Sequence, residues 1–228
     1  MRSPRPAPPV SPTLRRTGGP ARIGAVLAAL SAVLLTLVAL SWSPLMSFDR
    51  SVVRTLHRSA VGEPGIVQVN RILTDWVWDP WTMRALIAAA VLWLWWRRDR
   101  LFAVWIAATT ALGSAVQQTL KWAVGRERPQ WSDPVDSAHY AAFPSGHAMT
   151  ATVVCGLLVW IAVHRGAGRR ALRWCGAAAA VSVVGVGVTR LYLGVHWPTD
   201  VLAGWLMGAA LVALSVAAHR TAVLSRGR

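Results

Sequence analysis

The chain has 228 residues, of which 54% are hydrophobic and 14% are charged, and its formal net charge is +15. This apolar share excludes an ordinary soluble domain. The 23 arginines and the single lysine are dispersed over short segments instead of forming one basic patch, so the charge does not indicate a nucleic-acid partner.

The N-terminal residues 1–21 are rich in proline and arginine and precede the first long apolar run. Such a composition does not support a packed element, so we expect a disordered cytoplasmic tail here. Arginines followed by an apolar run also resemble a signal peptide. The run from Ile23 to Leu40 is long and ends without a convincing small-residue cleavage site, which favours a first membrane span.

Six apolar segments are each close to the ~20 residues that a helix needs to cross ~30 Å of hydrocarbon. Because backbone groups in lipid must form their hydrogen bonds within the segment, we expect the spans to be helices. The sequence predicts an all-α integral membrane bundle of six transmembrane helices, with one membrane domain over 22–219 and a cytoplasmic tail at 220–228. The spans are expected at residues 22–42, 81–96, 101–120, 148–163, 174–193 and 201–218.

Residues 43–80 form the longest connection between the predicted spans. Apolar residues recur at helical spacing in two stretches, which predicts an amphipathic segment lying on the outer membrane surface. Within the first stretch, the run Ser47-Phe48-Asp49-Arg50 is expected to cap a short helix. A lid over the site described below is the alternative role of this segment.

Arginine placement predicts the orientation of the bundle. With both termini in the cytoplasm, the inner side carries 15 arginines against one acid, Asp99, while the outer side is close to neutral. Positively charged loops are retained on the cytoplasmic side of a membrane. We therefore expect both termini to be cytoplasmic and the opposite end of the bundle to face outward.

Three groups of polar residues converge at this outer end. They lie where the third span ends, where the fourth begins, and where the fifth leads into the sixth. Together they supply three cations, two histidines, an aspartate and a Ser-Gly turn, a set of groups suited to binding and attacking a phosphate. The three motifs are Lys121-x6-Arg128-Pro129, Pro144-Ser145-Gly146-His147 and Arg190-x5-His196-x3-Asp200.

The cations of these motifs have two interpretations. Arg190 lies in an otherwise apolar stretch, where an unpaired guanidinium is costly and an anionic partner is expected. The alternative for Arg190, Lys121 and Arg128 is that they border a span and only reach the headgroup layer. For Arg126, in the same run, this interfacial role is the one that we expect.

The remaining motif residues also suit phosphate chemistry. Ser145 directly precedes an apolar helix and is expected as its N-cap, and the amide of Gly146 can approach an anion because no side chain intervenes. His196 and Asp200 are four residues apart, so the carboxylate can accept a hydrogen bond from one imidazole nitrogen while the other faces a substrate. A simple helix cap and a structural His–Asp hydrogen bond are the alternatives.

Taken together, the motifs resemble those of the type 2 phosphatidic acid phosphatase superfamily over roughly residues 81–218. The resemblance implies that His196 is a nucleophile that becomes phosphorylated, that Asp200 orients it, and that His147 is the general acid for the leaving oxygen. One departure from the family pattern is Thr189, where serine is usual. The residues that the resemblance assigns to the phosphoryl oxygens are Lys121, Arg128, Ser145, Gly146 and Arg190.

The resemblance implies a membrane lipid phosphatase whose substrate is a phosphate monoester or pyrophosphate in the outer leaflet. Phosphatidic acid, phosphatidylglycerophosphate and polyprenyl pyrophosphate are the candidates. No carboxylate cluster on the outer face offers a metal site, and three cations can take the place of magnesium, so neither metal nor cofactor is expected. The expected partners are the lipid phosphate and membrane lipids, and the sequence gives no oligomeric state.

Other functions would use some of the same residues. A phosphotransferase would pass the phosphoryl group to an alcohol instead of water, and an acceptor pocket has no sequence motif. A haloperoxidase would hold vanadate there, which the membrane spans and small size disfavour. A non-catalytic lipid-phosphate-binding protein is expected to lack one of His147, His196 and Asp200, all of which are present. A transporter is expected to place its charges near mid-membrane.

Overall fold

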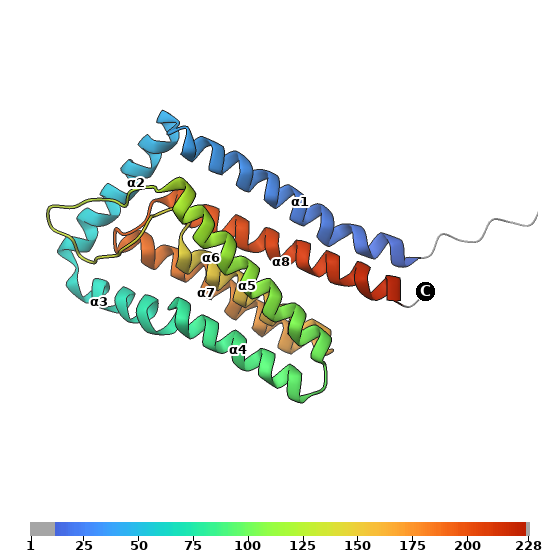
Figure 1. The fold of residues 1–228 in the computed structure, drawn as a ribbon. Helices are drawn as coiled ribbons and strands as arrows, with labels where there is room; N and C mark the ends of the chain where they lie inside the picture. Colours follow the sequence, from blue (N-terminus) through green and yellow to red (C-terminus); the bar gives the residue numbers. More distant parts are fainter. Residues whose placement is uncertain (1–11, 227–228) are drawn as a thin grey trace, which may run out of the picture.

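The computed structural model describes residues 12–226, so residues 1–11 of the expected N-terminal tail and residues 227–228 lie outside it. Within the described part, all regular secondary structure is helical, which confirms the all-α class (Figure 1). The elements are α1 (Pro12–Ala39), α2 (Ser43–Gly62), α3 (Pro64–Ile72), the π-helix η1 (Leu73–Val77), α4 (Pro80–Trp96), α5 (Arg100–Val124), α6 (Gly146–His164), α7 (Arg169–Tyr192) and α8 (Pro198–Arg226).

The long helices lie side by side and form an elongated bundle (Figure 1). Helix α6 is at its centre, because α4, α5, α7 and α8 all pack against it, whereas α1 packs along α8. This position explains why α6 is apolar on every side and buries ten of its residues. Phe102 of α5, Leu94 of α4 and Leu157 of α6 are fully buried in the shared core.

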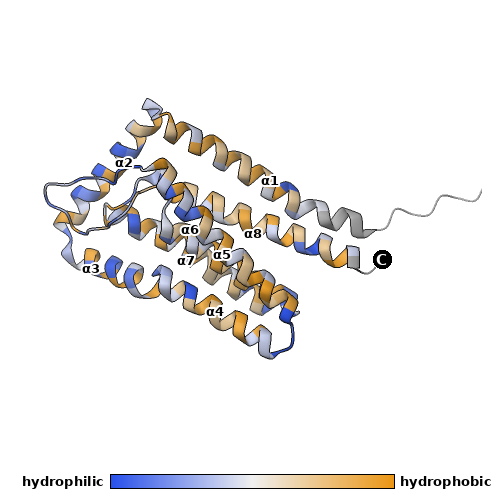
Figure 2. Cartoon of the chain, in the orientation of Figure 1, coloured by the Kyte–Doolittle hydropathy of each residue, from blue (hydrophilic) through white to orange (hydrophobic). Residues whose placement is uncertain are grey.

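Five helices of the described part are long and apolar enough to cross a membrane, namely α1 from Gly18 on, α5, α6, α7 and α8. The chain is therefore a multi-pass membrane protein. The expected second span corresponds to α4, whose 17 residues extend over ~25 Å and fall short of a full crossing. The count of six spans stays a prediction. Figure 2 shows the apolar shafts of the long helices, with hydrophilic residues gathered toward their ends.

Several helices extend beyond the bounds expected from the apolar segments. Helix α5 continues past Leu120 to Val124 and ends at Gly125, which has a φ of 57° and so adopts a left-handed conformation that suits glycine. Helix α8 continues to Arg226, through most of the expected C-terminal tail, because residues 219–226 contain neither glycine nor proline. Helix α1 begins at Pro12, earlier than the expected span.

The segment between α1 and α4 crosses one end of the bundle. Helices α2 and α3 lie across the end at which α5 and α7 finish and α6 and α8 begin (Figure 1). Both contact α7, and α2 also contacts α8. The run Ser47-Phe48-Asp49-Arg50 does not cap a helix as expected, because α2 starts at Ser43 and the run lies inside it, with Asp49 fully buried. Its carboxylate instead pairs with the loop after α5, as described below.

Candidate functional site

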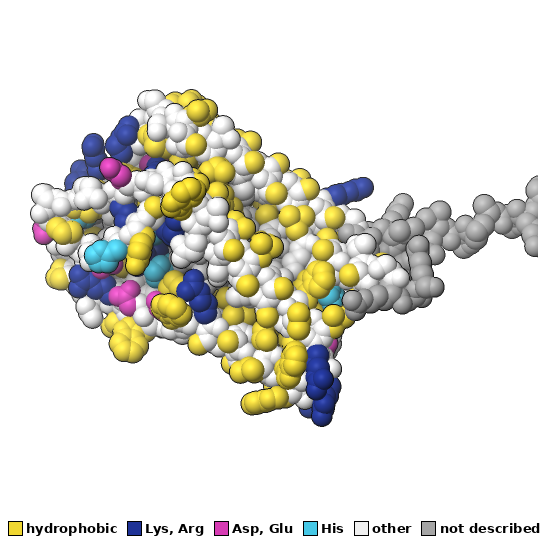
Figure 3. Space-filling view, in the orientation of Figure 1, with side chains coloured by type: hydrophobic (Ala, Val, Ile, Leu, Met, Phe, Trp, Pro, Cys, Tyr) yellow, Lys and Arg dark blue, Asp and Glu magenta, His cyan; other side chains and the backbone are white. Residues whose placement is uncertain are grey.

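The predicted site residues gather at the end of the bundle that α2 and α3 cover. Lys121 lies in the last turn of α5, and Arg190 lies in the last turn of α7. Gly146 and His147 open α6, and Asp200 lies in the first turn of α8. In the space-filling view, basic, acidic and histidine side chains cluster at this end, whereas the shaft of the bundle is mostly hydrophobic (Figure 3).

Arg128 connects the loop after α5 to the segment between α7 and α8. Its Nη1 donates to the backbone carbonyl of Val195 over 2.6 Å and lies 3.1 Å from Nε2 of His196. Its Nε donates to the carbonyl of Tyr140 over 2.8 Å and its Nη2 to that of His139 over 3.2 Å. Burial lowers the pKa of this guanidinium, although the pKa of an arginine lies far enough above 7 for it to stay charged.

His196 is 1% exposed and lies between Arg128 and Asp200. Its Nδ1 is 3.4 Å from Oδ2 of Asp200, so the structure brings together the pair expected from their spacing. The distance is long for a hydrogen bond, as is common for such pairs in unliganded enzymes. Burial, reinforced by the charges of Arg128, Arg190 and Lys121, lowers the pKa of His196 well below its ordinary value, so the ring is neutral at pH 7.

The neighbours of His196 fix which ring nitrogen carries the proton. A guanidinium can only donate hydrogen bonds, so Nε2, which faces Arg128, must carry the lone pair. A carboxylate can only accept, so Nδ1, which faces Asp200, carries the proton. The lone pair of Nε2 therefore lies on the side of the ring where Arg128 is found.

Arg190 is 4% exposed, which is inconsistent with an interfacial arginine that reaches the headgroup layer. Among the described residues 12–226, its Nη1 has a 3.4 Å contact with Oγ1 of Thr74 and a 4.0 Å ion pair with Asp136, and its Nε has no hydrogen-bond partner. Asp75 of η1 is a further charged neighbour, and burial together with Asp136 raises the pKa of its carboxyl group. A buried guanidinium this poorly satisfied can bind an additional anion.

His147 and Lys121 complete the cluster of charged and titratable groups. His147 lies within range of the charges on Arg190, Arg128 and Lys121 and also interacts with His196. Lys121 is coupled in turn to Arg128, Arg190 and Asp200, and its Nζ donates to the backbone carbonyl of Ala141. The three cations and two histidines that lie far apart in sequence are therefore neighbours in the fold.

The Ser-Gly turn has the local structure expected of a helix start. Ser145 is the N-cap of α6, its Oγ accepts from the backbone N of Ala148 at 3.5 Å, and its own N donates to the carbonyl of Asp200. A Cβ at Gly146 would lie 2.9 Å from Nε2 of Gln117, so any larger residue here would displace the end of the Gln117 side chain. Gln117 lies beside the turn and is 5% exposed, and no sequence motif indicates it.

Arg126 is the main residue whose environment differs from the sequence expectation. Instead of reaching headgroups, its guanidinium donates to Oδ1 of Asp200 over 2.6 Å and to Oδ2 of Asp49 over 2.7 Å. Both carboxylates are fully buried, whereas the side chain of Arg126 is 11% exposed. Only the proximity of Arg126 to Arg128 in the sequence could have indicated this position, and nothing in the sequence connects Asp49 to it.

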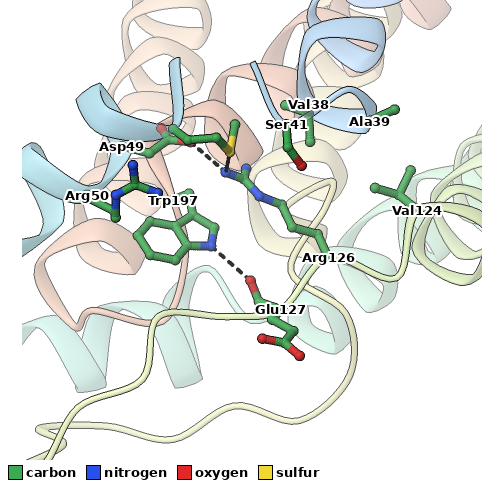
Figure 4. Close-up of a pocket in the computed structure, with 10 residues that line it drawn as sticks. Val38, Ala39, Ser41, Asp49, Arg50, Val124, Arg126, Glu127 and Trp197 are labelled. Carbon is green, nitrogen blue, oxygen red and sulfur yellow. Dashed lines mark hydrogen bonds and ion pairs between the residues drawn. The ribbon is translucent and has the colours of Figure 1, made fainter. Parts of the chain in front are cut away.

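Two cavities open beside Arg126. One, of about 420 Å³, is lined by the end of α1, by Asp49 and Arg50 of α2, and by Trp197 before α8 (Figure 4). The other, of about 470 Å³, is lined by the loop after α5 and includes Arg128 and Tyr140. This second cavity therefore gives open space next to Arg128, one of the residues predicted to bind the phosphate.

Two further expectations concern residues near the site. Thr189 keeps the hydroxyl of the family's usual serine, but its Oγ1 donates to the backbone carbonyl of Val186 over 2.8 Å. Among the residues described, no group of three or more His, Cys, Asp or Glu side chains is placed to hold a metal ion.

Comparison with known proteins identifies the family. The PAP2 superfamily matches residues 102–223, more than half of the chain. The chain is 25% identical over 167 residues to the undecaprenyl-diphosphatase of Sulfolobus acidocaldarius, covering 71% of this chain and 72% of that protein. It is 32% identical over 159 residues to the decaprenylphosphoryl-5-phosphoribose phosphatase of Mycolicibacterium smegmatis, covering 68% of this chain and 81% of that protein.

The same fold occurs in a solved structure. The crystal structure of a transmembrane PAP2 type phosphatidylglycerolphosphate phosphatase from Bacillus subtilis superimposes with a TM-score of 0.77, at 23% identity, over 87% of this chain and 96% of that one. The motifs, the helical bundle and the sequence match agree, and the chain belongs to the PAP2 superfamily.

Proposed function

We propose that the chain is a membrane lipid phosphatase that hydrolyses a phosphate monoester or pyrophosphate of a lipid through a phosphohistidine intermediate. The observation that carries the proposal is Arg190, a guanidinium 4% exposed at the end of a membrane helix. Within the part of the chain that the structure describes, its Nε has no partner and its nearest carboxylate lies 4.0 Å away. A phosphate dianion supplies the missing acceptors. The neighbouring cations Lys121 and Arg128 and the neutral His196 make this phosphate site a reactive one.

In the first step, the lone pair of Nε2 of His196 attacks phosphorus. The N–P bond forms as the bond between phosphorus and the leaving oxygen breaks, and His147, which is protonated beside the bound phosphate dianion, donates its proton to that oxygen. Asp200 accepts the hydrogen bond from Nδ1 of His196 and stabilises the positive charge that develops on the ring. Arg128 then shifts its Nη1 from Nε2 to a phosphoryl oxygen, because the same nitrogen lone pair is used to form the N–P bond.

In the second step, water attacks the phosphohistidine. His147, now neutral, accepts the proton of the water as the O–P bond forms, and the N–P bond electrons return to Nε2 of His196. Inorganic phosphate leaves and both histidines regain their starting state. The equatorial oxygens are held throughout by Lys121, Arg128 and Arg190, with the side chain of Ser145 and the amide of Gly146 at the start of α6.

Three fixed cations balance a phosphate dianion without a divalent metal. We therefore propose that turnover is metal-independent. Stabilisation of the transition state comes from groups already in place, since α5, α6, α7 and α8 each fix at least one of them.

We further propose that the site faces away from the cytoplasm and that both termini are cytoplasmic. The support is the distribution of arginines, because the end of the bundle opposite the site carries Arg97, Arg98 and Arg100 around the start of α5 and the arginines of residues 165–173 around the start of α7. A lipid phosphate in the outer leaflet would then reach the site from the membrane.

The proposed substrates follow from the names of relatives. Those relatives include an undecaprenyl-diphosphatase, a decaprenylphosphoryl-5-phosphoribose phosphatase and a phosphatidylglycerolphosphate phosphatase. The test is phosphate release from phosphatidic acid, phosphatidylglycerophosphate and a polyprenyl pyrophosphate in detergent, with and without EDTA. We expect at least one lipid to be hydrolysed with a kcat/KM well above that for glucose 6-phosphate and p-nitrophenyl phosphate, unchanged by EDTA. Faster turnover of both soluble esters would refute the lipid assignment, and loss of activity in EDTA would refute metal independence.

A further inference from the structure

Asp200 divides its two carboxylate oxygens between different partners. Oδ2 faces His196 and also accepts from the backbone N of Trp197 over 2.9 Å. Oδ1 accepts from Nη1 of Arg126 over 2.6 Å. The hydrogen bond from Arg126 to Oδ1 thus orients the carboxylate so that Oδ2 faces His196. Arg126 and His196 do not bond each other directly.

Arg126 is in turn held by α2. Its Nη2 donates to Oδ2 of Asp49 over 2.7 Å and to Sδ of Met46 over 3.4 Å, both on α2 (Figure 4). Its guanidinium also lies 5.5 Å from the ring centre of Trp197, the residue that follows His196. A planar fork that bonds two carboxylates at once fixes the direction of both.

Thr199 closes the network. Its Oγ1 donates to Oδ2 of Asp49 over 2.5 Å and accepts from Nη1 of Arg126 over 2.7 Å. Its backbone N donates to Oδ1 of Asp49 over 3.1 Å. Every oxygen of Asp49 and Asp200 therefore has a donor, and α2 is bonded to the turn that begins α8, where Asp200 lies. A buried polar network in which each member is satisfied is rigid and specifies one geometry.

We infer that Arg126 and Asp49 are positioning residues, through which α2 holds the carboxylate of Asp200 in the orientation that fixes the tautomer of His196. The surface segment containing α2 is then a brace for the reactive pair, in contrast to the lid considered from the sequence. The inference rests on the proposed function, because it assigns a role to residues that support His196 in that reaction.

The kinetic consequence separates positioning from phosphate binding. The guanidinium of Arg126 donates to Asp49, Asp200, Thr199 and Met46 and is not placed to bind the phosphate. We therefore expect its loss to leave KM little changed. Partners of this kind typically contribute about 10- to 100-fold, so Arg126→Met is expected to lower kcat by that factor. Arg126→Lys keeps the charge but can bond the two carboxylates only as a point charge, so an intermediate kcat is expected.

The decisive experiment is a double-mutant cycle with Asp200→Asn, using whichever of the three lipids the wild type hydrolyses fastest. If Arg126 acts through Asp200, adding Arg126→Met to Asp200→Asn should change kcat by less than about threefold, since nothing remains to be positioned. Arg50→Met is the matched control. Arg50 is exposed, lines the 420 Å³ cavity that Arg126 also lines, and donates a hydrogen bond to Oγ of Ser47. Losses that multiply in the double variant would overturn the inference.

A second measurement does not depend on turnover or on the stability of the Arg126→Met variant. In 15N-histidine NMR spectra of detergent-solubilised protein, with the His196 signals assigned from His196→Gln, the wild type should show a proton fixed on Nδ1. Asp49→Asn and Arg126→Lys should both show a mixture of tautomers, and Arg50→Met should match the wild type. An unchanged Nδ1 proton in both variants would contradict the inference. If the wild type hydrolysed no phosphate ester while the tautomer shifted, the proposed function would fail and the positioning role would stand.

Discussion

Nη1 of Arg128 lies 3.1 Å from Nε2 of His196, so an arginine proposed to bind the phosphate contacts the proposed nucleophile. Because a guanidinium donates and never accepts, this contact leaves the lone pair on Nε2 and the proton on Nδ1. The same arginine bonds three backbone carbonyls around the site. Arg128 therefore has two roles. It keeps the lone pair of His196 on Nε2, and it bonds the loop after α5 to the segment that carries His196.

Replacing Arg128 with lysine tests this double role. An ammonium keeps the charge but cannot bond the carbonyls of Val195, Tyr140 and His139 together. Arg128→Lys is expected to lower kcat/KM by at least about 100-fold, a loss of roughly 2.7 kcal/mol in transition-state stabilisation. Hydrogen exchange at residues 139–140 should accelerate in the same variant. Arg54→Lys on the exposed face of α2 is the control. Near-normal kcat/KM in Arg128→Lys would show that charge alone suffices.

Arg190→Met should separate activity from stability. Replacing Arg190 with an apolar side chain of similar volume removes the desolvation cost of a poorly paired buried charge, and its 4.0 Å partner Asp136 is 18% exposed, so that carboxylate stays in contact with water. We therefore expect an inactive variant whose Tm without ligand equals or exceeds that of the wild type, followed by tryptophan fluorescence. Vanadate should raise the Tm of the wild type and not that of the variant, because ligand binding to the folded state stabilises it. A large fall in Tm without ligand would mean that Arg190 is structural.

The lowered pKa of His196 predicts how stability depends on pH. Folding keeps this ring neutral below pH 6.5, whereas a histidine in the unfolded chain, with a pKa of about 6.5, takes up a proton. The unfolded state then binds more protons, so the free energy of unfolding should fall as the pH drops from 6.5 to 5.5, with His196 contributing about 1 kcal/mol. The variant His196→Gln should lose this part of the dependence. An identical slope in both proteins would contradict the burial of a neutral His196.

The orientation of the bundle can be tested by labelling. Ser137 lies in the loop at the site end and Gly168 between α6 and α7 at the other end, and both are exposed. In a background where Cys155 and Cys175 are replaced by alanine, Ser137→Cys should react with an impermeant thiol reagent in intact cells and Gly168→Cys should not. The reverse pattern would place the site in the cytoplasm and change which lipids can reach it.

The sequence predicted the helical class and the meeting of the motifs, because long apolar runs and their order determine which helix ends share a surface. It placed Lys121 and His147 outside their helices, since the apolar pattern stops at Leu120 and resumes at Ala148. The backbone, however, stays helical to Val124 and is helical again from Gly146. Backbone hydrogen bonding, which charged side chains do not interrupt, sets those boundaries.

The bracing of Asp200 could not be predicted. The Arg126–Asp49 pair joins residues 77 apart, and the path of α2 across the end of the bundle follows from tertiary packing and not from a local pattern. The same holds for Gln117 beside Gly146 and for Thr74 beside Arg190, where the partner is polar but carries no motif. Such supporting residues depend on which helices become neighbours, which periodicity does not specify.

The central claim is that His196 carries the phosphoryl group, and trapping the intermediate tests it most directly. Protein mixed briefly with a hydrolysed lipid phosphate, quenched in alkali and digested should give one phosphorylated peptide, with phosphate on His196 by mass spectrometry. Asp200→Asn should accumulate less of it and His196→Ala none, with turnover abolished in the latter. Phosphate on any other residue, or turnover by His196→Ala comparable to the wild type, would contradict the mechanism.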